Sequence, residues 1–243
     1  MSSYGILITV LLSTAPAWAD VNGAAPPDLS GALVLQRYLA ASETQKSAMN
    51  GIRSDVDIEA KLPKLNKEGR LHALRSISRV GQVTYHMLGF SGDNTVKKDV
   101  IARYLTAEVQ AQGNGQDLSI TPANYKFKFR GLQDHDGRQV YVFNVAPRKK
   151  KVGLFKGEIW LDPATCMPLR EQGRFVKNPS IFFKRMEFVR TYIMQDGISR
   201  PRHIDSVVKT RIVGPVELSI NFDNYTRAPD DESAGPAVGG DSQ

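Results

Sequence analysis

Two stretches of the chain decide its fold class, YKFKFR at residues 125–130 and VELSINFD at residues 216–223. Apolar and polar residues alternate in both, and successive side chains of a β-strand point to opposite faces. The apolar residues that share a face are Tyr125, Phe127 and Phe129 in the first stretch and Val216, Leu218, Ile220 and Phe222 in the second. Long strands with one apolar face form antiparallel sheets that must cover that face. The pattern leaves open whether helices, a ligand or both provide the cover.

The same alternation extends through most of the chain. Residues 55–62 (DVDIEAKL) place Val56 and Ile58 on an apolar face, and residues 69–78 and 82–90 form two strands of mixed polarity. From residue 124 to residue 225, strand follows strand, separated by turn sequences of the Asp-Gly, Asp-Pro and Asn-Pro kind. The sequence therefore predicts an α+β chain with about ten strands in one antiparallel sheet.

Two helices are expected beside the sheet. Ser30 can cap a helix that runs to about residue 50, where Gly51 ends it. Its expected apolar stripe is Ala32, Val34, Leu35, Tyr38 and Leu39. A second helix begins near Asn94 or Thr95, with an apolar stripe of Val96, Val100, Ile101, Tyr104, Leu105 and Val109 and a polar face of Lys97, Lys98, Arg103 and Glu108. This second stripe predicts a lid over the apolar face of the sheet.

The two ends of the chain predict export and an unstructured tail. A short apolar run at residues 6–12 precedes Ala17-Trp18-Ala19, the small-residue pattern that a signal peptidase reads. We expect residues 1–19 to be a signal peptide cleaved after Ala19, and the mature protein to be periplasmic. Residues 20–227 then form one domain, and residues 228–243 form a disordered acidic tail.

The chain is basic outside its tail. Its formal net charge is +7, and the tail carries four acidic residues and no Lys or Arg, so the rest carries +11. In an exported protein this favours anionic partners such as lipid head groups over nucleic acid. Residues 148–151 and 181–185 each place apolar residues beside cations, as at a membrane interface. The alternatives are a generic basic surface and charged hairpins that protect a sheet edge.

No residue pattern indicates catalysis, a metal or a cofactor. The only cysteine, Cys166, has no histidine beside it, so an incidental thiol is favoured over a nucleophile. The four histidines show no metal-ligand spacing, and His135 is expected in a solvated turn. Residues 55, 57 and 59 are acidic and share a strand face, where solvation is favoured over cation binding. We therefore expect a protein that is not an enzyme.

The succession of elements resembles the LolA/LolB-like superfamily of periplasmic lipoprotein carriers, and more closely the outer-membrane lipoprotein-sorting proteins. The resemblance rests on the helix at residues 100–105, on Gly157-Glu158-Ile159-Trp160-Leu161-Asp162-Pro163, and on Pro168-Leu169-Arg170 after that turn. It implies an incomplete β-barrel curved around an apolar cavity, covered by two or three helices. No functional residue of the family can be matched to a position here.

The leading hypothesis is a monomeric carrier that holds an acyl chain, lipid or lipoprotein in the half-barrel. The alternatives are a regulatory sensor that docks a partner protein of the inner or outer membrane and, more remotely, a hydrolase. The expected lipid-binding residues are Val56, Ile58, Tyr125, Phe127, Phe129, Leu218, Ile220 and Phe222, and the expected lid residues are Val100, Ile101, Tyr104 and Leu105.

Overall fold

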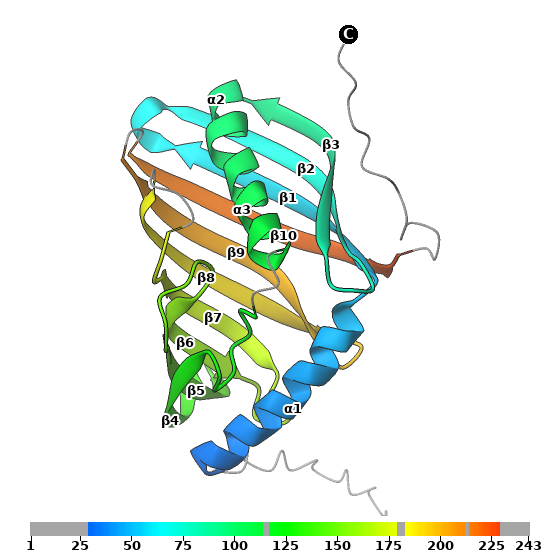
Figure 1. Cartoon of the computed structure of the whole chain (residues 1–243), viewed down its shortest axis with the longest axis vertical. Coiled ribbons are helices and arrows are strands. Elements are labelled where there is room, and N and C mark those ends of the chain that lie inside the picture. Colours follow the sequence, from blue (N-terminus) through cyan, green and yellow to red (C-terminus); the bar gives the residue numbers. More distant parts are fainter. Residues whose placement is uncertain (1–28, 114–116, 179–182, 212–213, 229–243) are drawn as a thin grey trace, which may run out of the picture.

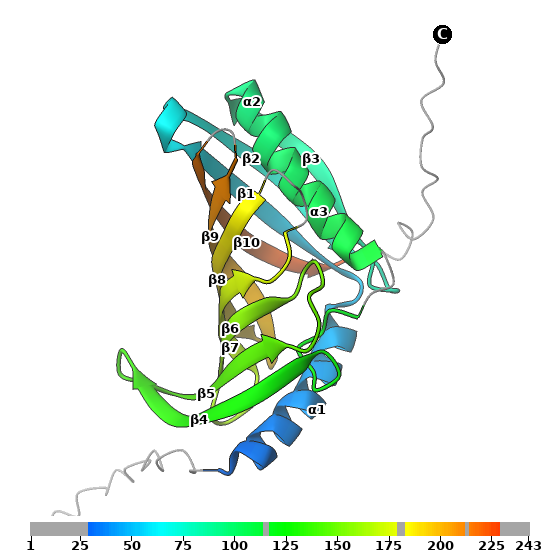
Figure 2. The same cartoon turned by 60° about the vertical axis from the view of Figure 1, so that its left-hand side comes forward.

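The computed structural model describes residues 29–113, 117–178, 183–211 and 214–228. The expected signal peptide and the acidic tail beyond Ala228 lie outside these residues, as does most of the turn expected at residues 178–180. The described residues form an α+β fold built on one open sheet, in which two helical segments lie on the same side (Figures 1 and 2).

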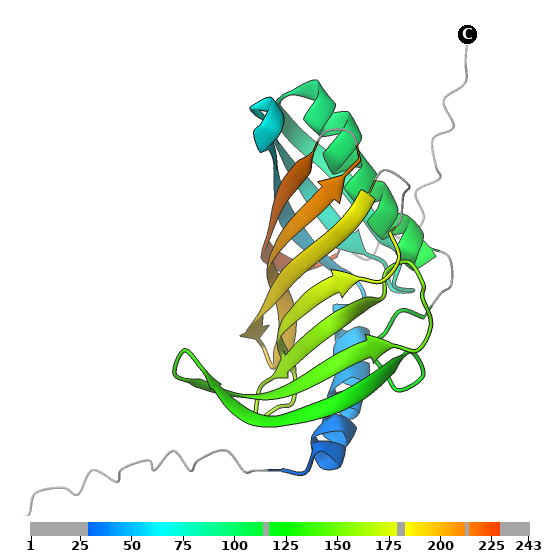
Figure 3. The same cartoon turned by 90° about the vertical axis from the view of Figure 1, so that its left-hand side faces the viewer.

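The sheet has ten strands, all joined to their neighbours in antiparallel pairs. The strands are β1 (Ile52–Leu62), β2 (Lys67–Ile77), β3 (Val83–Gly92), β4 (Tyr125–His135), β5 (Arg138–Pro147), β6 (Phe155–Leu161), β7 (Pro168–Phe175), β8 (Phe183–Gln195), β9 (Ile198–Thr210) and β10 (Pro215–Arg227). Their order is β3-β2-β1-β10-β9-β8-β7-β6-β5-β4, so the last strand pairs with the first and the ends of the sheet stay apart. The predicted number of strands and the open, curved sheet are confirmed (Figure 3).

The expected turns have the geometry that their residues favour. Asp136 and Gly137 have φ values of 57° and 80°, and Asp196 and Gly197 have 53° and 74°. Positive φ at both central residues is the requirement of the tight hairpin turns that match strand twist. The side chain of Asp162 accepts hydrogen bonds from the backbone N–H groups of Ala164 and Thr165, which closes the turn between β6 and β7.

The first helix, α1 (Gly31–Met49), is capped as predicted, because the Ser30 side chain accepts a hydrogen bond from Leu33 N. Its stripe is narrower than expected: Val34 and Tyr38 are buried, whereas Ala32 is exposed. The second helical segment consists of α2 (Asn94–Val96), one π-helical stretch η2 (Lys97–Ile101) and α3 (Ala102–Gly113). None of the helices in the described ranges combines the length and the hydropathy that a membrane crossing needs.

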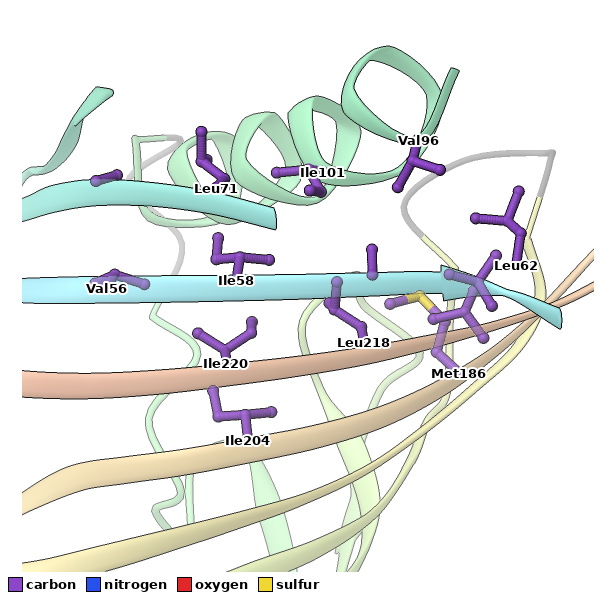
Figure 4. Close-up of a cluster of buried hydrophobic side chains, with 14 of the residues drawn as sticks. Val56, Ile58, Leu62, Leu71, Val96, Ile101, Met186, Ile204, Leu218 and Ile220 are labelled. Carbon is purple, nitrogen blue, oxygen red and sulfur yellow. The ribbon is translucent and has the colours of Figure 1, made fainter. Parts of the chain in front are cut away.

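Two apolar clusters fill the concave face of the sheet. The first lies between β1, β2, β9 and β10 and the α2–α3 segment, where Val96 and Ile101 point from the helical segment toward Ile58 and Ile220 on the strands (Figure 4). The second lies beneath α1 and contains Tyr125, Phe143, Phe155 and Phe188. Apolar burial of this kind supplies most of the stabilising free energy of a fold.

Candidate functional site: a cavity between the two helical segments

A cavity of about 560 Å³ lies on the concave face, between α1, α3 and strands β6 to β9. This volume is within the usual range for small-molecule sites. Helix α1 contributes Tyr38, Leu39, Ser42, Glu43, Gln45, Lys46 and Met49; α3 contributes Tyr104, Ala107 and Glu108; the loops contribute Leu118, Ser119, Ile120, Thr121, Val152 and Gly153; and the strands contribute Phe155, Pro168, Glu171, Phe175, Met186, Phe188, Arg190, Tyr192, Ile204 and Ser206. Most of the lining is apolar.

Aromatic side chains of the strands form one end of the cavity floor. The Phe188 ring lies edge-on to Phe155, with ring centroids 5.0 Å apart, and stacks on Phe175 at 4.9 Å. Met186 and Ile204 also line the cavity, and both belong to the first apolar cluster beneath the α2–α3 segment. The cavity therefore borders the core that the second helical segment covers.

An ion pair between the buried Glu171 and the half-buried Arg190 forms the other end of the cavity floor. Arg190 Nη1 donates a hydrogen bond to Glu171 Oε2 at 3.1 Å, and the Tyr192 hydroxyl hydrogen-bonds with both side chains. Burial, and then the charge of Glu171, raise the pKa of Tyr192. Burial alone would lower the pKa of Arg190, but Tyr192 and Glu171 outweigh it and raise that pKa. Arg190 therefore stays charged and Tyr192 stays neutral at physiological pH.

A second polar cluster fixes α3 to the outer strands. Glu108 accepts hydrogen bonds from the Tyr85 hydroxyl at 2.7 Å and from Arg75 Nη2 at 3.2 Å, and Arg75 Nε donates to the Tyr85 hydroxyl at 3.2 Å. The prediction that placed Glu108 on the solvent face of this helix is wrong, since Glu108 is half-buried and faces the sheet. The expectation for Val109 is also wrong, because Val109 is 39% exposed. The side of the α2–α3 segment that faces the sheet includes Tyr104 and Glu108 instead.

The residues expected to bind lipid lie on the concave face but outside this cavity. Five of them, Val56, Ile58, Leu218, Ile220 and Phe222, are buried in the first cluster. Tyr125 is buried in the second cluster, against which Phe127 and Phe129 pack half-buried. Among the expected lid residues, Ile101 is buried in the first cluster, Val100, Tyr104 and Leu105 pack against it, and Tyr104 also reaches the cavity wall.

Several cavity residues carry signals that the strand pattern hides. Glu171 and Arg190 occupy positions in their strands that face the core, because Glu171 is paired with the buried Ile159 and Arg190 with the buried Ile204. A charge at an apolar position of an alternating strand is the signal that could have identified them, and Tyr104-to-Glu108 spacing is the corresponding helical signal.

The other candidate groups have structural partners. Cys166 is fully buried in the second cluster, where burial raises its thiol pKa. Asp57 contacts His72 at 2.9 Å and Glu59 contacts Lys61 at 3.0 Å. His135, expected to be solvated, stacks on Trp160 with ring centroids 3.9 Å apart. No group of histidine, cysteine and acidic residues within the described ranges is arranged to hold a metal ion.

Neither a family model nor a curated protein sequence matches this chain. Solved structures do match, at low identity. A DUF1329 family protein from Desulfovibrio piger is 12% identical, with 84% of this chain and 94% of that chain covered and a TM-score of 0.46. A LolA superfamily protein from Nitrosomonas europaea is 12% identical, with 83% and 94% covered and a TM-score of 0.42. A putative outer membrane lipoprotein-sorting protein domain from Vibrio parahaemolyticus is 12% identical, with 82% and 94% covered and a TM-score of 0.43. The chain is thus structurally similar to LolA superfamily and lipoprotein-sorting proteins, at low sequence identity.

Proposed function

We propose that this protein is an exported carrier that holds an acyl chain of a lipid or lipoprotein between α1 and α3. The single observation that carries the proposal is the largely apolar cavity of about 560 Å³ on the concave face of the sheet. Each methylene removed from water contributes about 0.8 kcal/mol, so about ten methylenes contribute on the order of 8 kcal/mol before the entropic cost of binding. A carrier needs no reacting group.

The apolar residues under the α2–α3 segment would extend the same site. Met186 and Ile204 connect the cavity to the first cluster, in which Ile58, Leu218 and Ile220 are covered by Val96 and Ile101. Movement of the α2–α3 segment away from the sheet would join that covered surface to the cavity. In this proposal the lid residues and the five expected lipid-binding residues of the first cluster form the part of the site that opens for a longer or branched ligand.

The ion pair on the floor gives the cavity a polar end. Glu171 neutralises Arg190, so the floor offers hydrogen-bonding groups without a net charge of its own. An amphiphile whose ester or amide accompanies its acyl chain could contact these groups, whereas a plain hydrocarbon would exclude water from them without adding a hydrogen bond.

Native mass spectrometry of the protein purified from its periplasm, followed by organic extraction, tests the proposal. We expect a co-purifying acylated molecule at a stoichiometry near one per chain, which extraction removes. Protein that carries no acylated molecule and binds no added fluorescent fatty-acid analogue would refute the carrier function. Capture of a membrane protein by such ligand-free protein would favour the regulatory alternative.

A further inference from the structure

The basic charge of this chain is concentrated at one corner of the sheet. The residues 124–128, 144–158, 172–178 and 183–189, called the basic corner below, contain eleven Lys or Arg and only two acidic residues, Glu158 and Glu187, a net charge of +9. Residues 1–227 together carry +11, so the rest of that length contributes almost nothing. Within the basic corner every Lys and Arg side chain is exposed except that of Lys151, which is half-buried.

The strand pairing brings these charges onto one surface. Lys156 on β6 is opposite Arg174 on β7, which is opposite Glu187 on β8. Lys126, Lys128, Lys156, Arg174 and Arg185 line a single open groove of about 850 Å³. The strands β6, β7 and β8 are internal to the sheet, so protection of an exposed edge does not account for their cations.

The basic corner also borders the cavity. Residues 148–151 lead directly into Val152 and Gly153, which line the cavity wall. Arg148 Nε donates a hydrogen bond to Pro122 O at 2.7 Å, and Arg148 N donates to Asn124 O at 2.7 Å. These bonds tie the basic loop to the loop at residues 117–124, whose Leu118 to Thr121 portion forms another part of the cavity wall.

We infer that the basic corner docks the protein on an anionic membrane surface, with the loop at residues 148–151, which borders the cavity, beside the phosphate head groups. The inference rests on the proposed function, because a carrier for acyl chains must exchange its ligand with a lipid phase. Lys and Arg side chains near an anionic bilayer each strengthen binding by roughly fivefold, and salt screens this attraction. The +9 corner is therefore complementary to a phosphate-rich surface.

Vesicle sedimentation with the exported full chain tests the inference. The protein is mixed with phosphatidylcholine vesicles with and without phosphatidylglycerol, at low and at high salt. We expect binding to the anionic vesicles only, and its loss at high salt. Equal binding to neutral vesicles, or binding that salt leaves unchanged, would overturn the electrostatic docking. Binding to soluble polyglutamate but to neither vesicle would replace the membrane with an acidic protein partner.

Two triple variants of equal net charge separate the surface from the overall charge. K126Q/K149Q/K156Q should lower binding to anionic vesicles on the order of a hundredfold, while K61Q/K64Q/K98Q, whose lysines are exposed outside the basic corner, should change it far less. Equal losses in both variants would contradict a specific docking surface. Binding of a soluble fatty-acid analogue without vesicles reports on the cavity alone, so either proposal can fail while the other stands.

Discussion

Glu171 on β7 and Arg190 on β8 are direct cross-strand partners, joined by a hydrogen bond of 3.1 Å from Nη1 to Oε2, in a row that continues to Ile159 on one side and Ile204 on the other. A charged pair thus occupies two positions of an otherwise apolar row on the concave face. The Glu171 side chain is 9% exposed and the Arg190 side chain 35% exposed, so the carboxylate in particular depends on its partner in place of water.

Removal of one member of this pair should destabilise the fold. In Arg190→Leu, the Glu171 side chain, which is 9% exposed, loses its cationic partner. We expect a loss of about 3 kcal/mol in the free energy of unfolding, and recovery of most of it in the double variant Arg190→Leu/Glu171→Leu. Urea denaturation measures both. If the double variant were less stable than the single variant, the ion pair would contribute net stability to the fold, and each charge would do more than neutralise the other.

The contact of Glu108 with Tyr85 and Arg75 should hold α3 on the sheet. Glu108→Ala removes the carboxylate that accepts from both Arg75 and Tyr85, so we expect the amides of α3 to exchange hydrogen markedly faster. Asp99→Ala is the matched control, because Asp99 forms an exposed ion pair with Arg103 at 3.1 Å and such pairs contribute little. Equal acceleration by both substitutions would mean that Glu108 has no special anchoring role.

Two facing glycines allow β6 and β7 to approach closely where the sheet curves. A Cβ added to Gly157 would lie 1.9 Å from Gln172 O, and one added to Gly173 would lie 2.5 Å from Lys156 O. Gly157→Ala should therefore destabilise the protein by about 3 kcal/mol or more. Gly89→Ala, on β3 where an added Cβ meets nothing within 4 Å, should be neutral or slightly stabilising. Thermal denaturation compares them, and similar melting temperatures would refute the steric account.

The sheet was predictable from sequence because its apolar faces are nearly uninterrupted. Val216, Leu218, Ile220 and Phe222 are all buried, as their alternation with polar neighbours predicts. The turns were predictable because Asp-Gly sequences favour a backbone conformation with positive φ. These are local signals, and each is complete within a few residues.

The resemblance implied a cavity, but its position and lining residues were not predictable, because they depend on contacts between distant segments. Glu171, Arg190 and Tyr192 look like interruptions of the apolar pattern until β7 and β8 pair and α1 and α3 leave a space above them. The alternation of residues correctly identified the concave face, but the apolar residues at its most regular positions are covered by the α2–α3 segment. The cavity lies over the part of the sheet where apolar and polar residues alternate least regularly.

Buried tyrosines should make the protein sensitive to alkaline pH. Burial raises the pKa of Tyr125 to about 12, although its hydroxyl accepts a hydrogen bond from Phe155 N at 3.2 Å. Below about pH 10 the phenol is protonated in both states, so its contribution is constant. Above about pH 10 the unfolded chain loses this proton first, and the free energy of unfolding falls by up to about 1.4 kcal/mol per pH unit until the folded pKa is reached.

The variant Tyr125→Phe isolates this contribution. It should lower the free energy of unfolding at neutral pH by about 1 kcal/mol, through the lost hydrogen bond. Above about pH 10 the free energy of unfolding should fall less steeply with pH, by up to about 1.4 kcal/mol per pH unit, which corresponds to one proton. Guanidinium denaturation over a series of pH values measures the slope. An unchanged slope would mean that Tyr125 titrates normally in the folded protein.

The central claim is that an acyl chain occupies the cavity between α1 and α3. The most direct test measures binding of a fluorescent fatty-acid analogue to two variants in which an alanine of α3 is replaced by phenylalanine. Ala107 lines the cavity, whereas Ala102 on the same helix is exposed. Ala107→Phe should lower the affinity roughly tenfold or more, because the ring takes the place of several ligand methylenes. Ala102→Phe should bind like the unchanged protein, and circular dichroism should show both variants folded. Unchanged binding by folded Ala107→Phe would contradict the claim and place the ligand elsewhere.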